Sequence, residues 1–138
     1  MGKMLVQELM TADVRSLTPE ATLCDLLDLM YENDFRHVPI VDGEGELLGL
    51  VTHRDVVRGA VTSKDDLPQN WREEILSSRT VDNVMQAEVY TIGPTDTVED
   101  AATLMLEHKL GCLPVIEGGR LVGILTESDF VRHVAETC

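Results

Sequence analysis

A chain of 138 residues is about one ordinary domain long, and its formal charge of −14, from 25 acidic against 11 basic residues, argues against binding to nucleic acids or anionic membranes. Aliphatic side chains must supply the core, because two Phe, two Tyr and one Trp are too few to form a platform on which single-stranded bases stack. Three widely spaced cysteines, Cys24, Cys112 and Cys138, predict reduced thiols and a cytoplasmic protein, and no apolar run approaches the roughly 18 residues of a membrane span.

The chain begins with a predicted helical turn and a longer helix. The turn lies among the apolar residues at 5–10, and a brief extended segment follows at 14–17. Thr22, with Asp25 three residues later, is the pattern of a helix cap. Apolar residues then recur at intervals of three and four over 23–30, so one face of this helix is expected to be buried.

A β-hairpin and a further helix are predicted next. Two short aliphatic runs, at 38–41 and 47–51, flank a turn that contains glycine. A short helix is expected to follow from Thr52. After it comes a polar segment at 61–79, which has helical character around Trp71 and is interpreted as a linker.

The second half of the chain repeats the first. Residues 6–42 match residues 81–117 at a constant offset of 75, which falls to 74 after a turn that is one residue shorter. The sequence therefore predicts an α/β fold of two repeats, at 1–60 and 80–138, joined by the linker at 61–79. Each repeat has the order strand, helix, strand, strand, helix. The repeats are expected to pack as a pseudo-two-fold pair, because neither is large enough to be stable alone.

One segment recurs at the end of each hairpin, as Gly49–Asp55 and as Gly123–Asp129, with Gly, Thr and Asp at the same spacing. Thr52 and Thr126 stand at a predicted helix entrance, where free backbone N–H groups favour an anion such as phosphate. The Asp three residues later offers two acceptor oxygens, which suit the paired hydroxyls of a ribose. Thr-x-x-Asp is also an ordinary capping box, so the residues alone leave a helix cap and a nucleotide-binding site as alternatives.

The two repeats together resemble a tandem pair of CBS domains, a Bateman module, of the kind found in stand-alone bacterial and archaeal proteins. The resemblance covers nearly the whole chain and rests on the two recurring segments together with Arg36–Asp42 and Gly111–Ile116. It implies that an adenosine-containing ligand binds in a cleft between the repeats. AMP is the favoured ligand, and ADP, ATP, NAD and S-adenosylmethionine are the other candidates.

The resemblance also implies a role for individual residues. Asp55 and Asp129 would hold the ribose hydroxyls. The phosphates would face residues at the start of each final helix and before the first hairpin: Thr52, His53, Arg54, Thr126 and Arg36. The adenine pocket would be lined by the extended segments and the first hairpin strands: Ala12, Asp13, Val14, His37, Pro39, Ala87, Glu88, Val89 and Pro114.

The two predicted sites differ in charge. The first is surrounded by basic side chains: Arg36, His37, His53, Arg54 and Arg58. In the second, the matching residues are Gly111, Cys112, Glu127 and Ser128, with Arg132 kept. A hydrogen bond from a charged group contributes roughly 1.5–3 kcal/mol, so phosphate is expected to prefer the first site. The alternative is that these arginines are solvated or pair with surface carboxylates.

These features predict a regulatory module and not an enzyme. The sequence shows no recognisable nucleophile with a base, and its His and Cys residues lack metal-ligand spacing, so neither a catalytic residue nor a metal site is predicted. The expected function is adenine-nucleotide sensing by a homodimer, which signals to an unidentified effector protein through a change of conformation or assembly. The alternative is a structural module without ligand that dimerises or docks to a partner protein.

Overall fold

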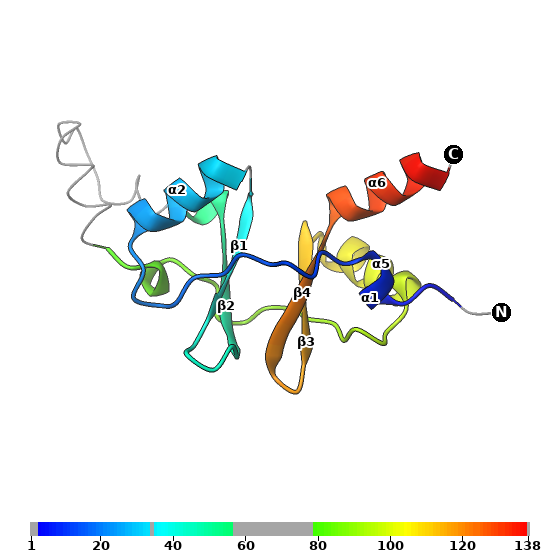
Figure 1. Ribbon diagram of the computed structural model, residues 1–138, viewed down its shortest axis with the longest axis horizontal. Helices are drawn as coiled ribbons and strands as arrows, with labels where there is room; N and C mark the ends of the chain where they lie inside the picture. Colours follow the sequence, from blue (N-terminus) through cyan, green and yellow to red (C-terminus); the bar gives the residue numbers. More distant parts are fainter. Residues whose placement is uncertain (1–2, 34, 57–78, 138) are drawn as a thin grey trace. The chain divides into compact units, whose positions relative to one another are not determined.

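The computed structural model describes residues 3–33, 35–56 and 79–137 (Figure 1). Its helices and strands are α1 (Val6–Leu9), α2 (Leu23–Asn33), β1 (His37–Val41), β2 (Leu47–Thr52), the 3₁₀ helix η1 (Val81–Asn83), α5 (Val98–His108), β3 (Cys112–Glu117), β4 (Arg120–Thr126) and α6 (Glu127–Thr137). Residues 53–56 are also helical. The predicted mixed α/β fold of two repeats is confirmed. Of the linker predicted at 61–79, only Arg79 lies within the described residues.

The helix start predicted at Thr22 is confirmed, and Thr97, its equivalent 75 residues later, also begins a helix. Thr22 Oγ1 accepts from the backbone N of Asp25 at 3.1 Å, and Asp25 Oδ2 accepts from the backbone N of Thr22 at 3.1 Å. At the start of α5, Thr97 Oγ1 accepts from the backbone N of Asp100 at 3.1 Å. Each cap satisfies backbone N–H groups that have no partner inside the helix.

Each repeat contributes an antiparallel hairpin, as predicted. β1 pairs with β2, with His37 opposite Thr52, and β3 pairs with β4, with Cys112 opposite Thr126. Each turn contains a glycine with a φ of 85°, a conformation that other residues rarely adopt, at Gly45 and Gly119.

A parallel bridge extends each hairpin on the side of its first strand. Leu17 pairs with Ile40 of β1, and Ile92 pairs with Val115 of β3. The extended segment predicted at 14–17 and its equivalent in the second repeat at 89–92 therefore pair through single bridges and do not form full strands.

An antiparallel bridge extends each hairpin on the side of its second strand. Gln86 exchanges both backbone hydrogen bonds with Leu50 of β2, at 2.9 and 3.0 Å. Thr11 does the same with Ile124 of β4, also at 2.9 and 3.0 Å. The sequence did not predict this pairing, in which a residue just before the extended segment of one repeat joins the hairpin of the other.

The chain consequently divides into two compact units whose limits differ from those of the repeats. One unit is Arg15–Val89, and the other combines Met1–Val14 with Tyr90–Cys138. The segment that leads into each repeat, which we call its leading segment (residues 3–14 and 79–89), thus belongs to the unit that holds the rest of the other repeat.

Each unit has an aliphatic core that includes one valine of a leading segment. Val81 is fully buried against the face of α2 and the β1–β2 hairpin, in a cluster with Leu23, Leu26, Met30, Val38, Ile40, Val51 and Val56. Val6, at the equivalent position, is fully buried in a cluster with Ile92, Ala101, Met105, Leu113, Val115 and Leu125. α1 accordingly contacts α5, α6 and β4 (Figure 1).

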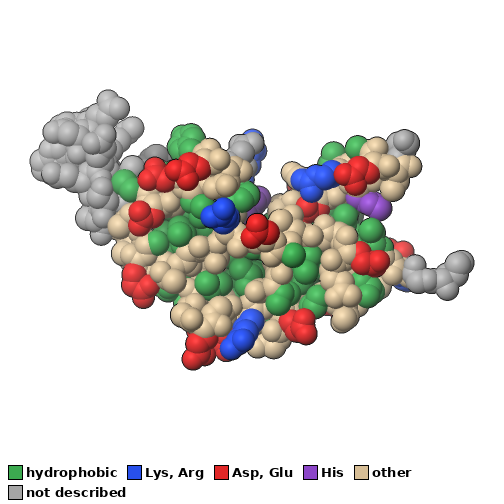
Figure 2. Space-filling view, in the orientation of Figure 1, with side chains coloured by type: hydrophobic (Ala, Val, Ile, Leu, Met, Phe, Trp, Pro, Cys, Tyr) green, Lys and Arg blue, Asp and Glu red, His purple; other side chains and the backbone are tan. Residues whose placement is uncertain are grey.

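Acidic side chains are spread over the visible face and do not gather in one patch (Figure 2). This distribution fits the strongly negative charge of the sequence. Among the helices of the described residues, none is both long and apolar enough to cross a membrane.

Candidate ligand-binding sites

The first recurring segment carries a carboxylate held at a helix entrance. Thr52 ends β2, and its backbone N donates to Asp55 Oδ2 at 2.9 Å. The backbone N of Asp55 donates in turn to Thr52 Oγ1 at 3.2 Å. These reciprocal bonds form a capping box, which fixes the Asp55 side chain where the backbone N–H groups of a helix begin.

Gln86 of the second leading segment faces the same carboxylate. Its Nε2 lies 3.2 Å from Asp55 Oδ1 and 3.3 Å from Asp55 Oδ2, so one amide group spans both oxygens. The side chain of Gln86 is exposed and that of Asp55 is partly buried. The first site is therefore built from both repeats, within the unit Arg15–Val89.

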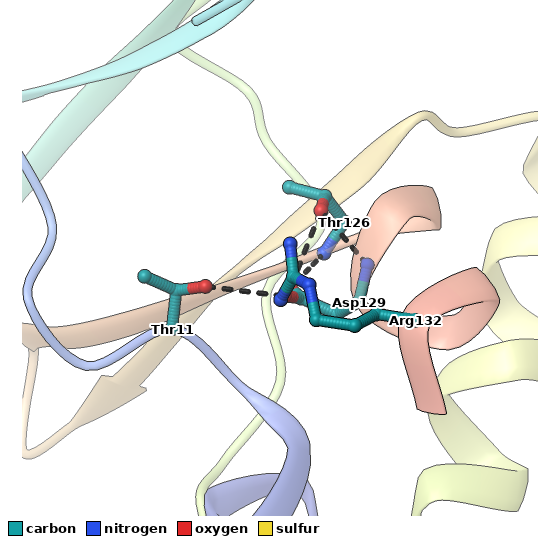
Figure 3. Close-up of polar contacts among 4 residues, drawn as sticks. All are labelled: Thr11, Thr126, Asp129 and Arg132. Carbon is teal, nitrogen blue, oxygen red and sulfur yellow. Dashed lines mark hydrogen bonds and ion pairs between the residues drawn. The ribbon is translucent and has the colours of Figure 1, made fainter. Parts of the chain in front are cut away.

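The second recurring segment holds Asp129 in a denser network (Figure 3). Asp129 Oδ2 accepts from the backbone N of Thr126 at 2.9 Å and from Thr126 Oγ1 at 3.2 Å. Asp129 Oδ1 accepts from Thr11 Oγ1 at 3.1 Å and from Arg132 Nη1 at 3.2 Å. Asp129 is only 2% exposed, and these donors offset the cost of burying its charge.

Thr11 and Gln86 are functional candidates that the sequence reasoning missed. They occupy equivalent positions of the two repeats, 75 residues apart, and each directly precedes a residue predicted to line the adenine pocket, Ala12 or Ala87. The repeat alignment could have shown that they correspond. It could not show that each side chain donates to the aspartate of the other repeat, because a Thr and a Gln at equivalent positions do not indicate a common hydrogen-bond partner.

The fold brings part of the predicted basic cluster together. The backbone N of His53 donates to the backbone O of Arg36 at 2.9 Å, which places these two residues side by side. The equivalent bond of the second site, at 3.2 Å, joins Glu127 and Gly111. The difference in charge that the sequence predicts is thus present at equivalent backbone positions.

The side chains of Arg36, His53 and Arg54 are exposed. The ion pairs within residues 3–33, 35–56 and 79–137 are Lys3–Glu99 and Arg132–Asp129, so neither Arg36 nor Arg54 is paired with a carboxylate in this part of the chain. Arg58, also assigned to the first site, lies outside the described residues.

The residues predicted to line an adenine pocket differ in exposure. Pro39 and Pro114 are fully buried in the middle of β1 and β3. The side chains of Val14, His37 and Val89 are partly buried. The remaining ones are exposed: Ala12, Asp13, Ala87 and Glu88. The pocket itself stays a prediction.

Cys112 takes the position of His37 in the second repeat. Burial raises the pKa of the Cys112 thiol to about 12, so the thiol is neutral at ordinary pH. The second site thus has an uncharged group where the first has an imidazole. Over the described part of the chain, no group of three or more His, Cys, Asp or Glu residues is arranged to hold a metal ion.

The glycine of each recurring segment makes room for the leading segment. A Cβ atom on Gly49 would lie 2.8 Å from the backbone O of Gln86 and 2.8 Å from Met85 Sδ. A Cβ atom on Gly123 would collide with the side chain of Met10. At Gly49 both a backbone and a methionine approach closely, and at Gly123 a methionine does.

Comparison with known proteins identifies the family. The model of the CBS domain matches residues 6–62 and residues 81–136, most of the chain and both repeats. The chain belongs to the CBS domain family. Its two matches make it a CBS pair, as the resemblance implied.

Several similar proteins have nearly the same length as this chain, and one of them, CBSX2, is named a CBS-pair protein. A CBS domain-containing protein of Dictyostelium discoideum is 33% identical over 94% of this chain and 90% of its own. The crystal structure of a Vibrio cholerae protein named AcuB, after acetoin utilization, is 34% identical, with a TM-score of 0.86 over 99% of this chain and 93% of its own. CBSX2 of Arabidopsis thaliana, solved in complex with AMP, is 26% identical, with a TM-score of 0.81 over 97% and 98%.

Other matching proteins are much longer. The chain spans 41% of the uncharacterized protein MJ1225 of Methanocaldococcus jannaschii, at 28% identity over 92% of this chain. It spans 26% of the homoserine O-acetyltransferase of Methanohalophilus mahii, at 32% identity over 99% of this chain. CBS pairs similar to this one therefore also occur as parts of larger proteins.

Proposed function

We propose that this CBS pair is a regulatory module that binds an adenosine-containing ligand, with AMP favoured, and signals by a change of conformation or assembly. The observation that carries the proposal is the same in both units. In each unit, an aspartate at a helix entrance accepts from the backbone N of the Thr three residues earlier. The same aspartate faces a donor side chain from the other repeat's leading segment. The similarity to CBSX2, whose structure contains AMP, supports the choice of ligand.

The capping box and the ligand site are compatible functions of the same residues. A carboxylate has about four acceptor positions, and the cap uses one of those on Asp55 Oδ2. The remaining positions suit two ribose hydroxyls. Thr52, beside the exposed His53 and Arg54, would then face the phosphate.

AMP should bind more strongly at the first site than at the second. Arg36, His53 and Arg54 are available there to a phosphate, whereas the second site has Glu127 and buried Asp129. Like charge at the second site disfavours an anionic ligand, and one charged hydrogen bond changes affinity by about tenfold or more.

Calorimetric titration with AMP tests this proposal. We expect the double variant Asp55→Ala and Arg54→Ala to lose most of the binding, and Asp129→Ala to lose less. Asp28→Ala, which removes an exposed carboxylate of α2, is the matched control and should bind as the wild type does. Equal losses in the Asp55 and Asp129 variants would contradict the predicted inequality of the sites.

A structural role is the second candidate, and exposed apolar residues favour it. Leu106 of α5 is 80% exposed, and Val131 and Val134 of α6 are 68% and 58% exposed. Val131 and Val134 lie three residues apart on α6, and burying them against a partner would remove their apolar surface from water. Thermal melting with AMP, ADP, ATP, NAD and S-adenosylmethionine separates the candidates. A ligand at 100 times its Kd should stabilise the fold by about 2.7 kcal/mol, whereas no shift with any of them favours the structural role.

A further inference from the structure

The contact between Gln86 and Asp55 has the geometry of a ligand contact. A single Nε2 lies at nearly equal distances, 3.2 and 3.3 Å, from the two oxygens of the carboxylate. An amide oxygen in this place would repel the carboxylate, so the assignment of the NH₂ group to this side is chemically required. Two neighbouring hydroxyls of a ribose would donate to the same pair of oxygens.

The backbone of Gln86 is fixed while its side chain is not. Its N and O are bonded to Leu50 at 2.9 and 3.0 Å, which anchors the residue on β2. The side chain is exposed, and the amide can leave the carboxylate by rotation about side-chain bonds. Water can then hydrate the released amide, so the movement leaves no buried polar group without a partner.

We infer that Gln86 is a specificity-determining residue of the first site, because its amide competes with the vicinal hydroxyls of the ligand for the two oxygens of Asp55. The inference rests on the proposed function, in which Asp55 receives those hydroxyls. A ligand without both hydroxyls cannot replace both contacts of the amide and gains nothing from displacing it. Gln86 therefore raises the concentration of AMP at which the site fills and lowers the preference of the site for an intact ribose over one without the two hydroxyls.

The second site lacks this arrangement. Thr11, at the position equivalent to Gln86, donates to Oδ1 of Asp129 only, and Arg132 shares that oxygen. Thr126 occupies Oδ2 through both its backbone N and its hydroxyl. Removing the Thr11 hydroxyl thus leaves the other donors in place, so position 11 should control ligand access less than position 86 does.

The test is calorimetric titration of the full chain with AMP and with its 2′,3′-dideoxy analogue. The variant Gln86→Met keeps the length of the side chain and removes the competing donor. We expect it to bind AMP about tenfold more tightly than the wild type, the effect of one modest hydrogen bond, and to bind the dideoxy analogue unchanged. Gln86→Ala should behave in the same way and guards against an effect of the methionine itself. Thr11→Val is the matched variant of the second site and should change AMP affinity less.

The outcomes separate the inference from the proposed function. AMP binding that is unchanged or weakened in both Gln86 variants overturns the inference and leaves the proposed function standing. An equal gain for the dideoxy analogue also overturns it, because the gain would then not depend on the hydroxyls. If neither the wild type nor the variants bind AMP, the proposed function fails and the inference fails with it. A gain that disappears when Asp55→Ala is added to Gln86→Met supports the inference.

Discussion

The thiol of Cys112 shows how burial alone can make the stability of this protein depend on pH. Burial raises the pKa of Cys112 from 9.0 to about 12 in the folded chain. Between these values the unfolded chain releases the proton and the folded chain keeps it, so the free energy of unfolding falls as the pH rises. The contribution is constant well below pH 9. We expect the step from pH 8 to pH 10 to cost about 1.4 kcal/mol through this thiol.

Urea unfolding of the wild type and of Cys112→Val measures this cost. The valine variant has no thiol to ionise at that position, so its stability should fall by about 1.4 kcal/mol less between pH 8 and pH 10. Between pH 6 and pH 8 the two proteins should show nearly the same pH dependence, which serves as the internal control. A parallel decline of both proteins above pH 9 would mean that the Cys112 thiol ionises in the folded state as easily as in the unfolded state.

At the scale of single elements, local patterns predicted most of the fold. The spacing of apolar residues located α2 and α5, and the glycine turns located both hairpins, because these signals depend only on neighbouring residues. The bridges of Thr11 and Gln86 to the hairpin of the other repeat depend on residues far away in the sequence. A local sequence pattern does not identify such a distant partner. For the same reason Asp55 and Asp129 were found as candidates, whereas the donors that face them were not.

The glycines of the two recurring segments test how tightly the leading segments pack. In Gly49→Ala the new methyl group meets the backbone O of Gln86, which cannot move without breaking its bridge to β2, so we expect a loss of about 1–3 kcal/mol. In Gly123→Ala it meets only the flexible side chain of Met10, and the loss should be smaller. Gly43→Ala adds a methyl group with nothing within 4 Å and should change stability by less than about 0.5 kcal/mol.

Chemical unfolding of these three variants gives the order directly. The expected order of destabilisation is Gly49→Ala, then Gly123→Ala, then Gly43→Ala. If Gly49→Ala proved as harmless as Gly43→Ala, the close approach of Gln86 to β2 would be wrong, and with it the position of the Gln86 amide on Asp55.

At the scale of the whole molecule, the exchange of leading segments means that neither repeat completes its core without the other. Residues 3–14 supply Val6 to the core formed by the second repeat, and residues 79–89 supply Val81 to the core formed by the first. The same two segments deliver Thr11 to Asp129 and Gln86 to Asp55. Each candidate site therefore needs both repeats, which gives a physical reason why CBS domains occur here as a pair.

This exchange predicts where the effect of a core mutation will be felt. Val6 and Val81 are both fully buried, and truncation of either to Ala should cost about 2 kcal/mol through lost burial and the cavity left behind. Val6→Ala should raise amide hydrogen exchange in β3, β4 and α5, although these elements lie at least 90 residues further along the chain. Val81→Ala should instead raise exchange in α2, β1 and β2, which precede it. Hydrogen exchange followed by mass spectrometry resolves these regions. Loosening of α2 and β1 by Val6→Ala would show that the leading segment packs on its own repeat, whereas the reciprocal pattern follows only if each repeat completes the core of the other.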